Sequence, residues 1–263
     1  MAAPAGPARR GRRRALSEEA FLDAALALLD EGGAEAMSVR AIAHRVGVAP
    51  NAVYTYFPDK AAVVAALVER VIGEVDSGVL TDRSRPWRDR VEGLAVELRR
   101  HLSAHPAVVG LMISAPMEGP HALALNESLL ELLADAGLDT ADAARAHYLL
   151  MTYVFGSLAL ETAEVRQPGP LPPEDERIAE RHRVFAAIPA GDFPRSAAAA
   201  ATMAAYVSTD QYVWGLRRLL DGIAAESWGR RPRGDHHASA LQHHGEHERD
   251  HDDALAAVDD DGE

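Results

Sequence analysis

The sequence predicts an all-α protein, and three observations support this fold class. Hydrophobic residues make up 48% of the 263 residues but aromatic residues only 5%, so Ala, Leu and Val must supply most of the core. Ala and Leu are among the strongest helix formers. Apolar residues recur at helical spacing from Leu16 to about Ala225, and no stretch of any length alternates as a β-strand would.

Four short helices are predicted between residues 15 and 76. Each has a side chain suited to its first turn, either as an N-cap or as a first-turn proline. Gly32-Gly33 is expected to end the first helix, and Gly47 to form the turn after the second. The predicted start signals are Ser17, Ser38, Pro50 and Asp59.

After a turn-rich link over residues 77–85, the pattern predicts helices up to about residue 226. Proline and glycine mark the breaks between them. The predicted segments are 86–104, 107–115, 121–136, 140–165, 174–187, 194–206 and 209–226.

These patterns divide the chain into four predicted regions. They are a disordered Arg-rich arm, a domain of short helices, a larger helical domain and a disordered His-rich and acidic tail. Their predicted bounds are 1–14, 15–76, 77–229 and 230–263.

The net charge of −13 would ordinarily argue against a nucleic-acid binder, but the charge is unevenly distributed. Residues 1–72 contain nine basic and eight acidic residues, and five of the basic ones lie between Arg9 and Arg14. Residues 235–263 contain ten acidic residues and a single arginine. The sequence therefore predicts a basic N-terminal region and an acidic tail, and the overall charge does not exclude DNA as a partner.

Several classes of protein are excluded or disfavoured. The absence of cysteine excludes disulfide scaffolds, thiol catalysis and Cys-ligated metal sites. No run of about 18 apolar residues predicts a membrane span, and the N-terminus lacks the apolar segment of a signal peptide, so we expect a cytoplasmic protein without a membrane partner. No catalytic triad order, phosphate-binding glycine loop or zinc-protease motif is present, so we expect neither an enzyme nor a cofactor.

The stretch Ser38–Lys60 predicts a helix-turn-helix. Two short helices flank a tight turn at Gly47, and the small residue Ala43 allows the second helix to approach closely. In this motif the second helix enters the DNA major groove with its N-terminal residues leading. The alternative is an ordinary helical hairpin with two surface tyrosines.

Residues 1–75 resemble the DNA-binding domain of TetR-family transcriptional regulators. The resemblance rests on a series of short elements in the correct order and spacing. These are Ala25-x-x-Leu28-Leu29-x-x-Gly32, Ile42-Ala43, Gly47-Val48, Val53-Tyr54-x-Tyr56-Phe57 and Lys60.

The resemblance implies which residues contact DNA. Arginine and asparagine side chains read base edges, an alanine can contact a thymine methyl group, and hydroxyl and ammonium donors suit phosphates. The expected base contacts are Asn51 and Ala52, at the helix start set by Pro50, and Arg40, at the start of the preceding helix. The expected phosphate contacts are Tyr54, Tyr56 and Lys60, with Thr55 as a further contact. The arm Arg9–Arg14 could reach the minor groove or add only nonspecific attraction.

Residues 86–225 resemble, more loosely, the C-terminal domain of the tetracycline-repressor type. The matching pieces include Trp87-Arg88, Tyr153-x-x-Gly156 and Val213-Trp214-Gly215-Leu216. In this family a helix pair meets its twofold mate as a four-helix bundle, here helices 140–165 and 209–226. The candidate dimer residues are Leu149, Thr152, Tyr153, Gly156, Leu160, Tyr212, Leu216, Leu219 and Ile223.

The family also implies a small-molecule pocket, expected between helices 86–115 and 121–165. The candidate lining residues, each of which could equally be plain core, are His101, His105, Met112, Met117, Asn126, Leu129 and Tyr148. Tetracycline itself is not supported, and no metal site is expected. His243, His247 and His251 could bind a metal if the tail were helical, but a disordered solvating tail is the preferred interpretation.

Together these expectations describe a homodimeric repressor that leaves a palindromic operator when an unknown small effector binds. Three alternatives remain open. The same fold could act as an activator or dual regulator, or as a ligand sensor that signals through a protein partner; a helical enzyme is disfavoured because no catalytic constellation is present. The sequence does not identify the effector, the operator or the regulated genes.

Overall fold

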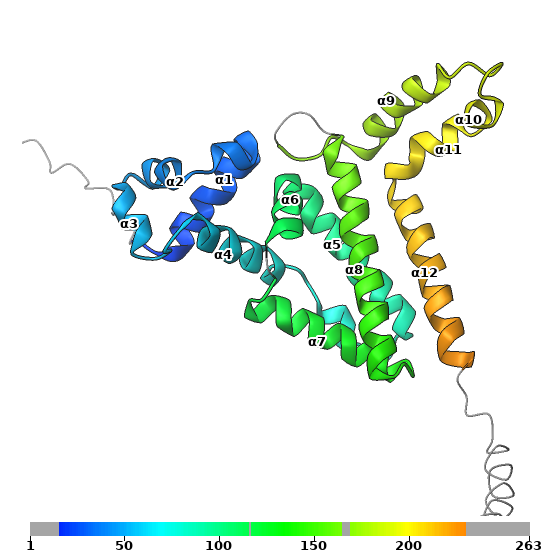
Figure 1. The fold of residues 1–263 in the computed structure, drawn as a ribbon, viewed down its shortest axis with the longest axis horizontal. Coiled ribbons are helices and arrows are strands. Elements are labelled where there is room, and N and C mark those ends of the chain that lie inside the picture. Colours follow the sequence, from blue (N-terminus) through cyan, green and yellow to red (C-terminus); the bar gives the residue numbers. More distant parts are fainter. Residues whose placement is uncertain (1–15, 116, 165–168, 230–263) are drawn as a thin grey trace, which may run out of the picture. The chain divides into compact units, whose positions relative to one another are not determined.

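The computed structural model describes residues 16–115, 117–164 and 169–229, and every regular element in these ranges is a helix (Figure 1). The all-α prediction is confirmed. Residues 1–15 and 230–263, and with them the predicted arm and His-rich tail, lie outside the described residues. In the described part of the chain, no helix combines the length and the apolar character that crossing a membrane requires.

The first four helices form a small module that we call the head. Their bounds are α1 Glu18–Ala36, α2 Val39–Val46, α3 Pro50–Tyr54 and α4 Lys60–Gly73. Helices α1, α2 and α4 each begin at a predicted cap, because Ser17, Ser38 and Asp59 accept hydrogen bonds from backbone N–H groups three residues on. Gly47 ends α2 in the left-handed conformation with φ 82°.

The head closes over a core of fully buried side chains. Phe21 on α1 packs against Phe57 with ring centroids 6.4 Å apart. Ile42 and Ala43 on α2 and Val53 on α3 are completely buried, so the two helices pack along the face that the sequence predicted. This packing fixes α3 against α2 in a helix-turn-helix.

Two predicted features of the head differ in the structure. Helix α1 extends beyond Gly32-Gly33 to Ala36, with a kink where Gly33 adopts φ 69°. Glycine adopts this angle without steric cost, so it bends the chain and the helix resumes. Helix α3 is only five residues long, and Tyr56 and Phe57 follow it in a turn whose backbone N–H groups still bond the Val53 carbonyl.

We call the remaining helices the body. The contacts described below are those of its residues from Trp87 to Asp221. Its elements are α5 Trp87–Ala104, α6 Pro106–Ser114, α7 Pro120–Asp135, α8 Thr140–Ala163, α9 Glu174–Ala186, α10 Pro194–Ala198, α11 Ala200–Ala204 and α12 Thr209–Gly229. Short 3₁₀ helices cover Gly78–Thr81 and Ala205–Val207. The predicted helix 194–206 is thus broken into α10, α11 and a 3₁₀ turn.

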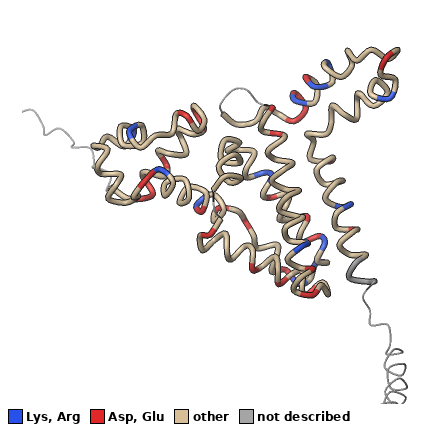
Figure 2. The backbone as a smooth tube through the Cα atoms, in the orientation of Figure 1, with Lys and Arg blue, Asp and Glu red and all other residues tan. Residues whose placement is uncertain are grey.

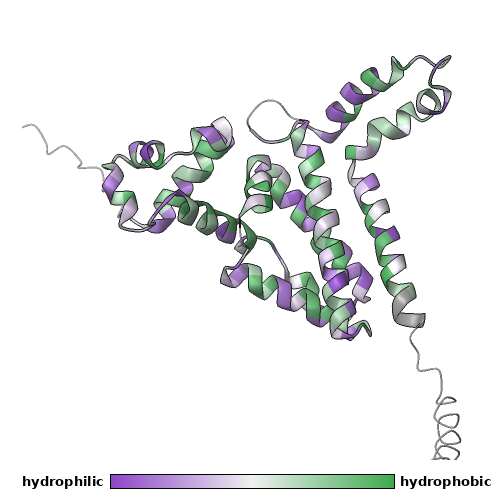
Figure 3. Cartoon of the chain, in the orientation of Figure 1, coloured by the Kyte–Doolittle hydropathy of each residue, from purple (hydrophilic) through white to green (hydrophobic). Residues whose placement is uncertain are grey.

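Helices α5, α6, α7 and α8 pack together and bury the apolar core of the body. Figure 3 shows hydrophilic and hydrophobic residues alternating along α7, as expected for a helix with one face in the core. By its contacts the chain divides into two compact units, Met1–Asp221 and Gly222–Glu263, and α12 crosses the boundary. The first unit contains the head, because α4 packs on α6 and α7 and α1 packs on α6.

Candidate nucleic-acid interface

Helix α3 presents a short exposed face at the tip of the head. Pro50 opens the helix, and Asn51, Tyr54 and Thr55 are exposed, whereas Ala52 is half-buried. The Thr55 hydroxyl lies 3.5 Å from the backbone carbonyl oxygen of Asn51. The exposure of Asn51 is compatible with the base contact that the sequence predicts, which stays a prediction.

The two tyrosines of the predicted phosphate contacts have different surroundings. Tyr54 is 52% exposed at the end of α3. Tyr56 packs its ring on Phe21, with centroids 5.2 Å apart, and its hydroxyl donates a 3.0 Å hydrogen bond to the Leu16 carbonyl. No sequence signal predicts the hydrogen bond between Tyr56 and Leu16, because the two residues are 40 positions apart. Tyr54 is therefore the more available of the two hydroxyl donors.

Basic side chains flank α3 without lying on it. Arg40 is exposed in the first turn of α2, and Figure 2 shows the basic residues of that helix. Arg45 forms an ion pair with Glu31 on α1. Lys60 is exposed at the start of α4, and its ammonium group lies 3.4 Å from the Ala34 carbonyl. Lys60 thus adds positive charge to free N–H groups at a helix start, which favours an anion such as phosphate.

A carboxylate on helix α4 contributes to the connection between this surface and the body. Glu69 on α4 accepts hydrogen bonds from the backbone N–H groups of His121 and Ala122, the latter at 3.3 Å, at the start of α7. The His121 ring adds a contact, with Nδ1 2.9 Å from Glu69 Oε1. A side chain at Gly119 would collide with Glu69, so the close approach depends on that glycine.

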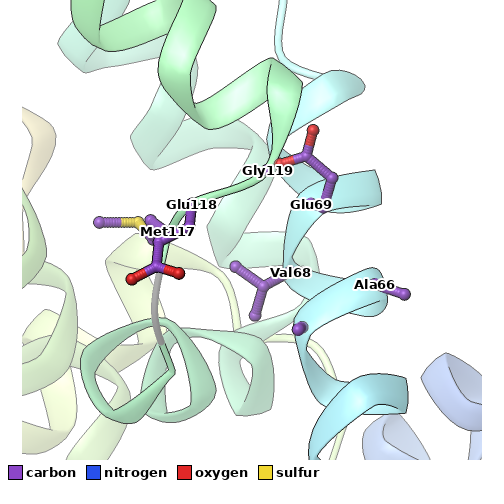
Figure 4. A pocket seen from close by; sticks show the side chains of 7 residues that line it. Ala66, Val68, Glu69, Met117, Glu118 and Gly119 are labelled. Carbon is purple, nitrogen blue, oxygen red and sulfur yellow. The ribbon is translucent and has the colours of Figure 1, made fainter. Parts of the chain in front are cut away.

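A cavity of about 280 Å³ lies beside this contact, between α4 and the segment that leads into α7 (Figure 4). Val68 and Glu69 line it from α4, and Met117, Glu118 and Gly119 line it from the other side. Of the seven predicted ligand residues, Met117 alone is among its lining residues.

A second link between head and body involves the two histidines of that prediction. His105, at the start of α6, has Nδ1 2.9 Å from Asp30 Oδ2 on α1. His101 on α5 lies 3.8 Å from Glu74, just after α4, and its ring meets His105 edge-on at 6.3 Å. These residues therefore bridge α1 and α4 to the body.

The other predicted ligand residues do not gather around one cavity. Met112 and Leu129 are buried in the core. Asn126 is paired with His147, whose Nε2 lies 3.1 Å away, and burial lowers the pKa of that histidine. Tyr148 is 74% exposed, so it does not line an internal pocket. Neighbouring helix positions point about 100° apart, which is why His147 faces Asn126 and Tyr148 faces outward.

Comparison with known proteins decides the family. Residues 21–67 match the family model described as bacterial regulatory proteins of the tetR family, and residues 81–227 match the tetracyclin repressor-like C-terminal domain. The chain belongs to the tetR family. A curated relative, an HTH-type transcriptional regulator of Saccharopolyspora erythraea, is 33% identical over 181 residues, which cover 68% of this chain and 75% of the relative. This tetR-family chain is a DNA-binding transcriptional regulator and not an enzyme.

Further similarities agree with this assignment. The transcriptional repressor DrrR1 of Streptomyces coeruleorubidus is 27% identical over 81% of this chain and 79% of its own length. The crystal structure of a possible TetR-family regulator from Streptomyces coelicolor matches with TM-score 0.68 and 28% identity, over 80% of this chain and all of that one. The S. coelicolor protein ActR in complex with (S)-DNPA shares the fold at TM-score 0.66 and 22% identity, over 81% of this chain and all of that one.

The dimer residues predicted for this tetR-family chain fall into two groups. On α8, Leu149, Thr152, Gly156 and Leu160 are exposed, and Leu160 is 67% exposed. In contrast, the candidates Tyr212, Leu216 and Ile223 are buried, and Leu219 and Tyr153 are half-buried.

Tyr212, one of the dimer candidates on α12, is buried against its own chain. Its hydroxyl donates to the Ala95 carbonyl at 3.0 Å, and its ring stacks on Tyr153 at 5.6 Å. Burial raises the pKa of Tyr212 strongly. Helical spacing shows which residues share a face, but not whether the face meets its own chain or a partner. Trp214 is 59% exposed on α12, and the prediction omitted it.

The sequence also gave no signal for a buried charge network in the body. The guanidinium of Arg99 on α5 donates to Glu161 on α8 at 2.7 Å, to the Val207 carbonyl at 2.8 Å and to the Thr209 hydroxyl at 2.8 Å. Arg177 on α9 lies 2.7 Å from the same Glu161 oxygen. The network ties α5, α8, α9 and the start of α12 together.

Among the described residues, no group of three or more potential ligands is arranged to hold a metal ion. His243, His247 and His251, which carried the metal alternative, lie outside the described residues.

Proposed function

We propose that the chain acts as a homodimer that represses transcription by occupying a palindromic operator, and that a small-molecule effector releases it. The observation that carries this proposal is the exposed surface of the helix-turn-helix. Asn51 and Tyr54 on α3, with Arg40 and Lys60 beside it, provide base-reading and phosphate-binding groups around one short helix.

DNA binding can be tested by fluorescence anisotropy on a duplex selected from random DNA with the full-length protein. Lys60→Ala should weaken binding and reduce the slope of log affinity against log salt by about one, because one phosphate contact is lost. Arg83→Ala is the matched control, since Arg83 forms an exposed ion pair with Asp135 in the body. An equal effect of the two substitutions would contradict the proposed interface.

The proposed dimer uses the exposed face of α8. Leu149, Gly156 and Leu160 form an apolar stripe with a small residue at its centre, which allows close packing of two helices. In such a dimer the two recognition helices would lie roughly 34–36 Å apart, one DNA turn. Leu160→Glu should yield a monomer in light scattering and abolish tight binding to the palindrome. Val184→Glu on α9 also removes an exposed apolar residue and is the control.

For the effector we propose the cavity between α4 and the segment before α7. Its position beside Glu69 supports this site, because an occupant would press on the carboxylate that bonds the start of α7. The structural neighbour ActR is solved with actinorhodin, and relatives include tetracycline repressors, which makes a small-molecule effector the natural expectation. An effector must bind the DNA-free state more tightly to release the dimer.

Filling the cavity tests this site. A small-molecule library is first screened for compounds that release the full-length protein from labelled DNA. Ala66→Leu should then abolish release while DNA affinity in the absence of compound is retained, because the side chain of Ala66 borders the cavity. Ala134→Leu, at an exposed position of α7, is the control. Unchanged release in Ala66→Leu would place the effector elsewhere.

A further inference from the structure

Two histidines of the body and two carboxylates of the head form one cluster, which we call the histidine link. His105 Nδ1 lies 2.9 Å from Asp30 Oδ2, and His101 Nε2 lies 3.8 Å from Glu74 Oε2. Asp30 is on α1 and Glu74 directly follows α4, so each histidine faces a carboxylate across the contact between the two modules. The two imidazole rings are 6.3 Å apart, so the four groups act on one another.

Two atoms of the histidine link have unmet hydrogen-bonding capacity. Within the described part of the chain, Asp30 Oδ1 and His101 Nε2 are buried atoms without a hydrogen-bond partner. A carboxylate oxygen buried in this way is costly when the facing imidazole is neutral. Protonation gives the imidazole a positive charge and makes both ring nitrogens donors. A proton should therefore strengthen the contact of His105 with Asp30 and allow His101 to bond Glu74.

The other charged groups nearby leave Asp30 dependent on its histidine. A guanidinium already bonds Glu74 at 2.9 Å, whereas no lysine or arginine of the described residues forms an ion pair with Asp30. On α5, Glu97 lies one turn before His101, and a hydrogen bond from Arg100 holds the pKa of Glu97 below its ordinary value. The charged neighbours of the link are Arg70 and Asp23 on the head side and Glu97 and Arg100 on the body side.

The contact between α4 and α7 should respond less to pH. Glu69 is bonded there by two backbone N–H groups, which do not titrate. His121 also contacts Glu69, but its side chain is 62% exposed, so solvent screens a charge on its ring. We therefore expect the histidine link to supply most of the pH dependence of head docking.

We infer that the histidine link is a proton-sensitive latch that holds the DNA-binding head against the body, with His105 positioning the head through Asp30. Histidine is the side chain whose charge ordinarily changes between about pH 5 and pH 8. Docking places carboxylates against both rings, so the docked head binds protons more readily than an undocked one. Docking is therefore strengthened as pH falls through this range and weakened as pH rises. The latch would make the orientation of the DNA-reading surface depend on pH, whether or not an effector exists.

Single-molecule energy transfer in the full-length protein tests the latch. The chain has no cysteine, so dyes can be attached at Glu35→Cys on α1 and Glu131→Cys on α7, both at exposed positions. The labelled protein is mixed with an excess of unlabelled chain, so that a dimer carries at most one labelled copy. Lowering the pH from about 8 to about 6 should raise the ratio of docked to undocked molecules by about fivefold or more, a typical coupling between two binding events.

The decisive variant combines His101→Gln with His105→Asn. The amide nitrogen of Gln replaces Nε2 and that of Asn replaces Nδ1, so a neutral donor is kept at each position but neither side chain can be protonated. In this variant the ratio should not change with pH. Asp30→Asn, which removes the facing charge, should reduce the response as well. Thermal melting verifies that each variant is folded.

Two single substitutions are matched controls. His182→Asn removes an exposed histidine of α9, and His121→Asn removes the histidine at Glu69; both should keep the pH response. The inference is overturned if the double variant responds like the unaltered chain, if the unaltered chain does not respond, or if His121→Asn alone abolishes the response. None of these results depends on operator binding or repression, which the anisotropy assay tests separately.

Discussion

The capped helix starts of the head depend on local side chains, whereas two helix starts of the body also receive side chains from far along the chain, beside local caps at Asp139 and Ser208. In the head, α1, α2 and α4 are capped by the residue directly before them, namely Ser17, Ser38 and Asp59. In the body, the N-terminus of α7 is capped by Glu69, 52 residues earlier in the chain. The first N–H group of α12 is bonded by Glu174, 35 residues earlier, at 3.0 Å.

This difference concerns which side chains stabilise the helix starts of the two modules. Local caps stabilise the head helices through residues that lie next to them in the chain, without a side chain from a distant helix. The distant caps of the body form only when helices dock. Glu69 and Glu174 therefore make helix starts depend on packing, and a change in packing can alter them. We expect the body to respond to substitutions over long distances and the head to respond locally.

The largest expected effect is at the buried network of the body. Glu161→Ala would remove the 2.7 Å carboxylate partner of the buried guanidinium of Arg99 and leave it with Glu174 at 3.4 Å, and breaking a buried pair in this way costs about 3–5 kcal/mol. Urea unfolding at fixed protein concentration measures the loss. Glu180→Ala removes an exposed ion pair with Arg183 and should cost less than about 1 kcal/mol. Similar losses for the two variants would contradict the importance of the network.

A smaller effect is expected at a local cap of the head. Ser38→Ala removes the acceptor for the Ala41 N–H group and should lower the free energy of unfolding by about 1 kcal/mol. Operator affinity should fall in parallel, because α2 supports α3. Ser114→Ala is the control, since its hydroxyl only bonds carbonyls within α6. If Ser38→Ala weakened binding without any loss of stability, the cap would instead be a DNA contact.

The smallest effect concerns pH. Burial lowers the pKa of His147 below its ordinary value of about 6.5, so the native state binds fewer protons than the unfolded state as pH falls through that value. Stability must then fall with pH. His147→Gln should reduce the decrease in melting temperature between about pH 7 and about pH 5.5.

Melting at about pH 8, where the imidazole is neutral in both states, separates the packing cost of His147→Gln from its effect on proton binding. An identical pH dependence in the variant and the unaltered chain would show that His147 does not contribute. A clear contribution would show that the pair of His147 with Asn126, which joins α8 to α7, affects the stability of the body.

Most of the head and the helix positions of the body could be predicted from the sequence. Pro50 at the first position of α3 and Gly47 in the turn before it act through their own backbone angles, so their effect is visible without neighbours. The dimer and ligand residues were harder to assign. Tyr148 and Leu216 show the same helical spacing as their neighbours, and only packing decides that the first faces outward and the second inward.

The sequence by itself determined the helices, the helix-turn-helix and the family, because caps, turns and periodicity are local properties of the chain. Only the tertiary structure decided that Glu69 caps α7, that Arg99 is buried against Glu161, and that Tyr56 bonds Leu16. Their partners are 52, 62 and 40 residues away along the chain. A hydrogen bond over such a distance depends on where two helices dock, and no local pattern of residues records that position.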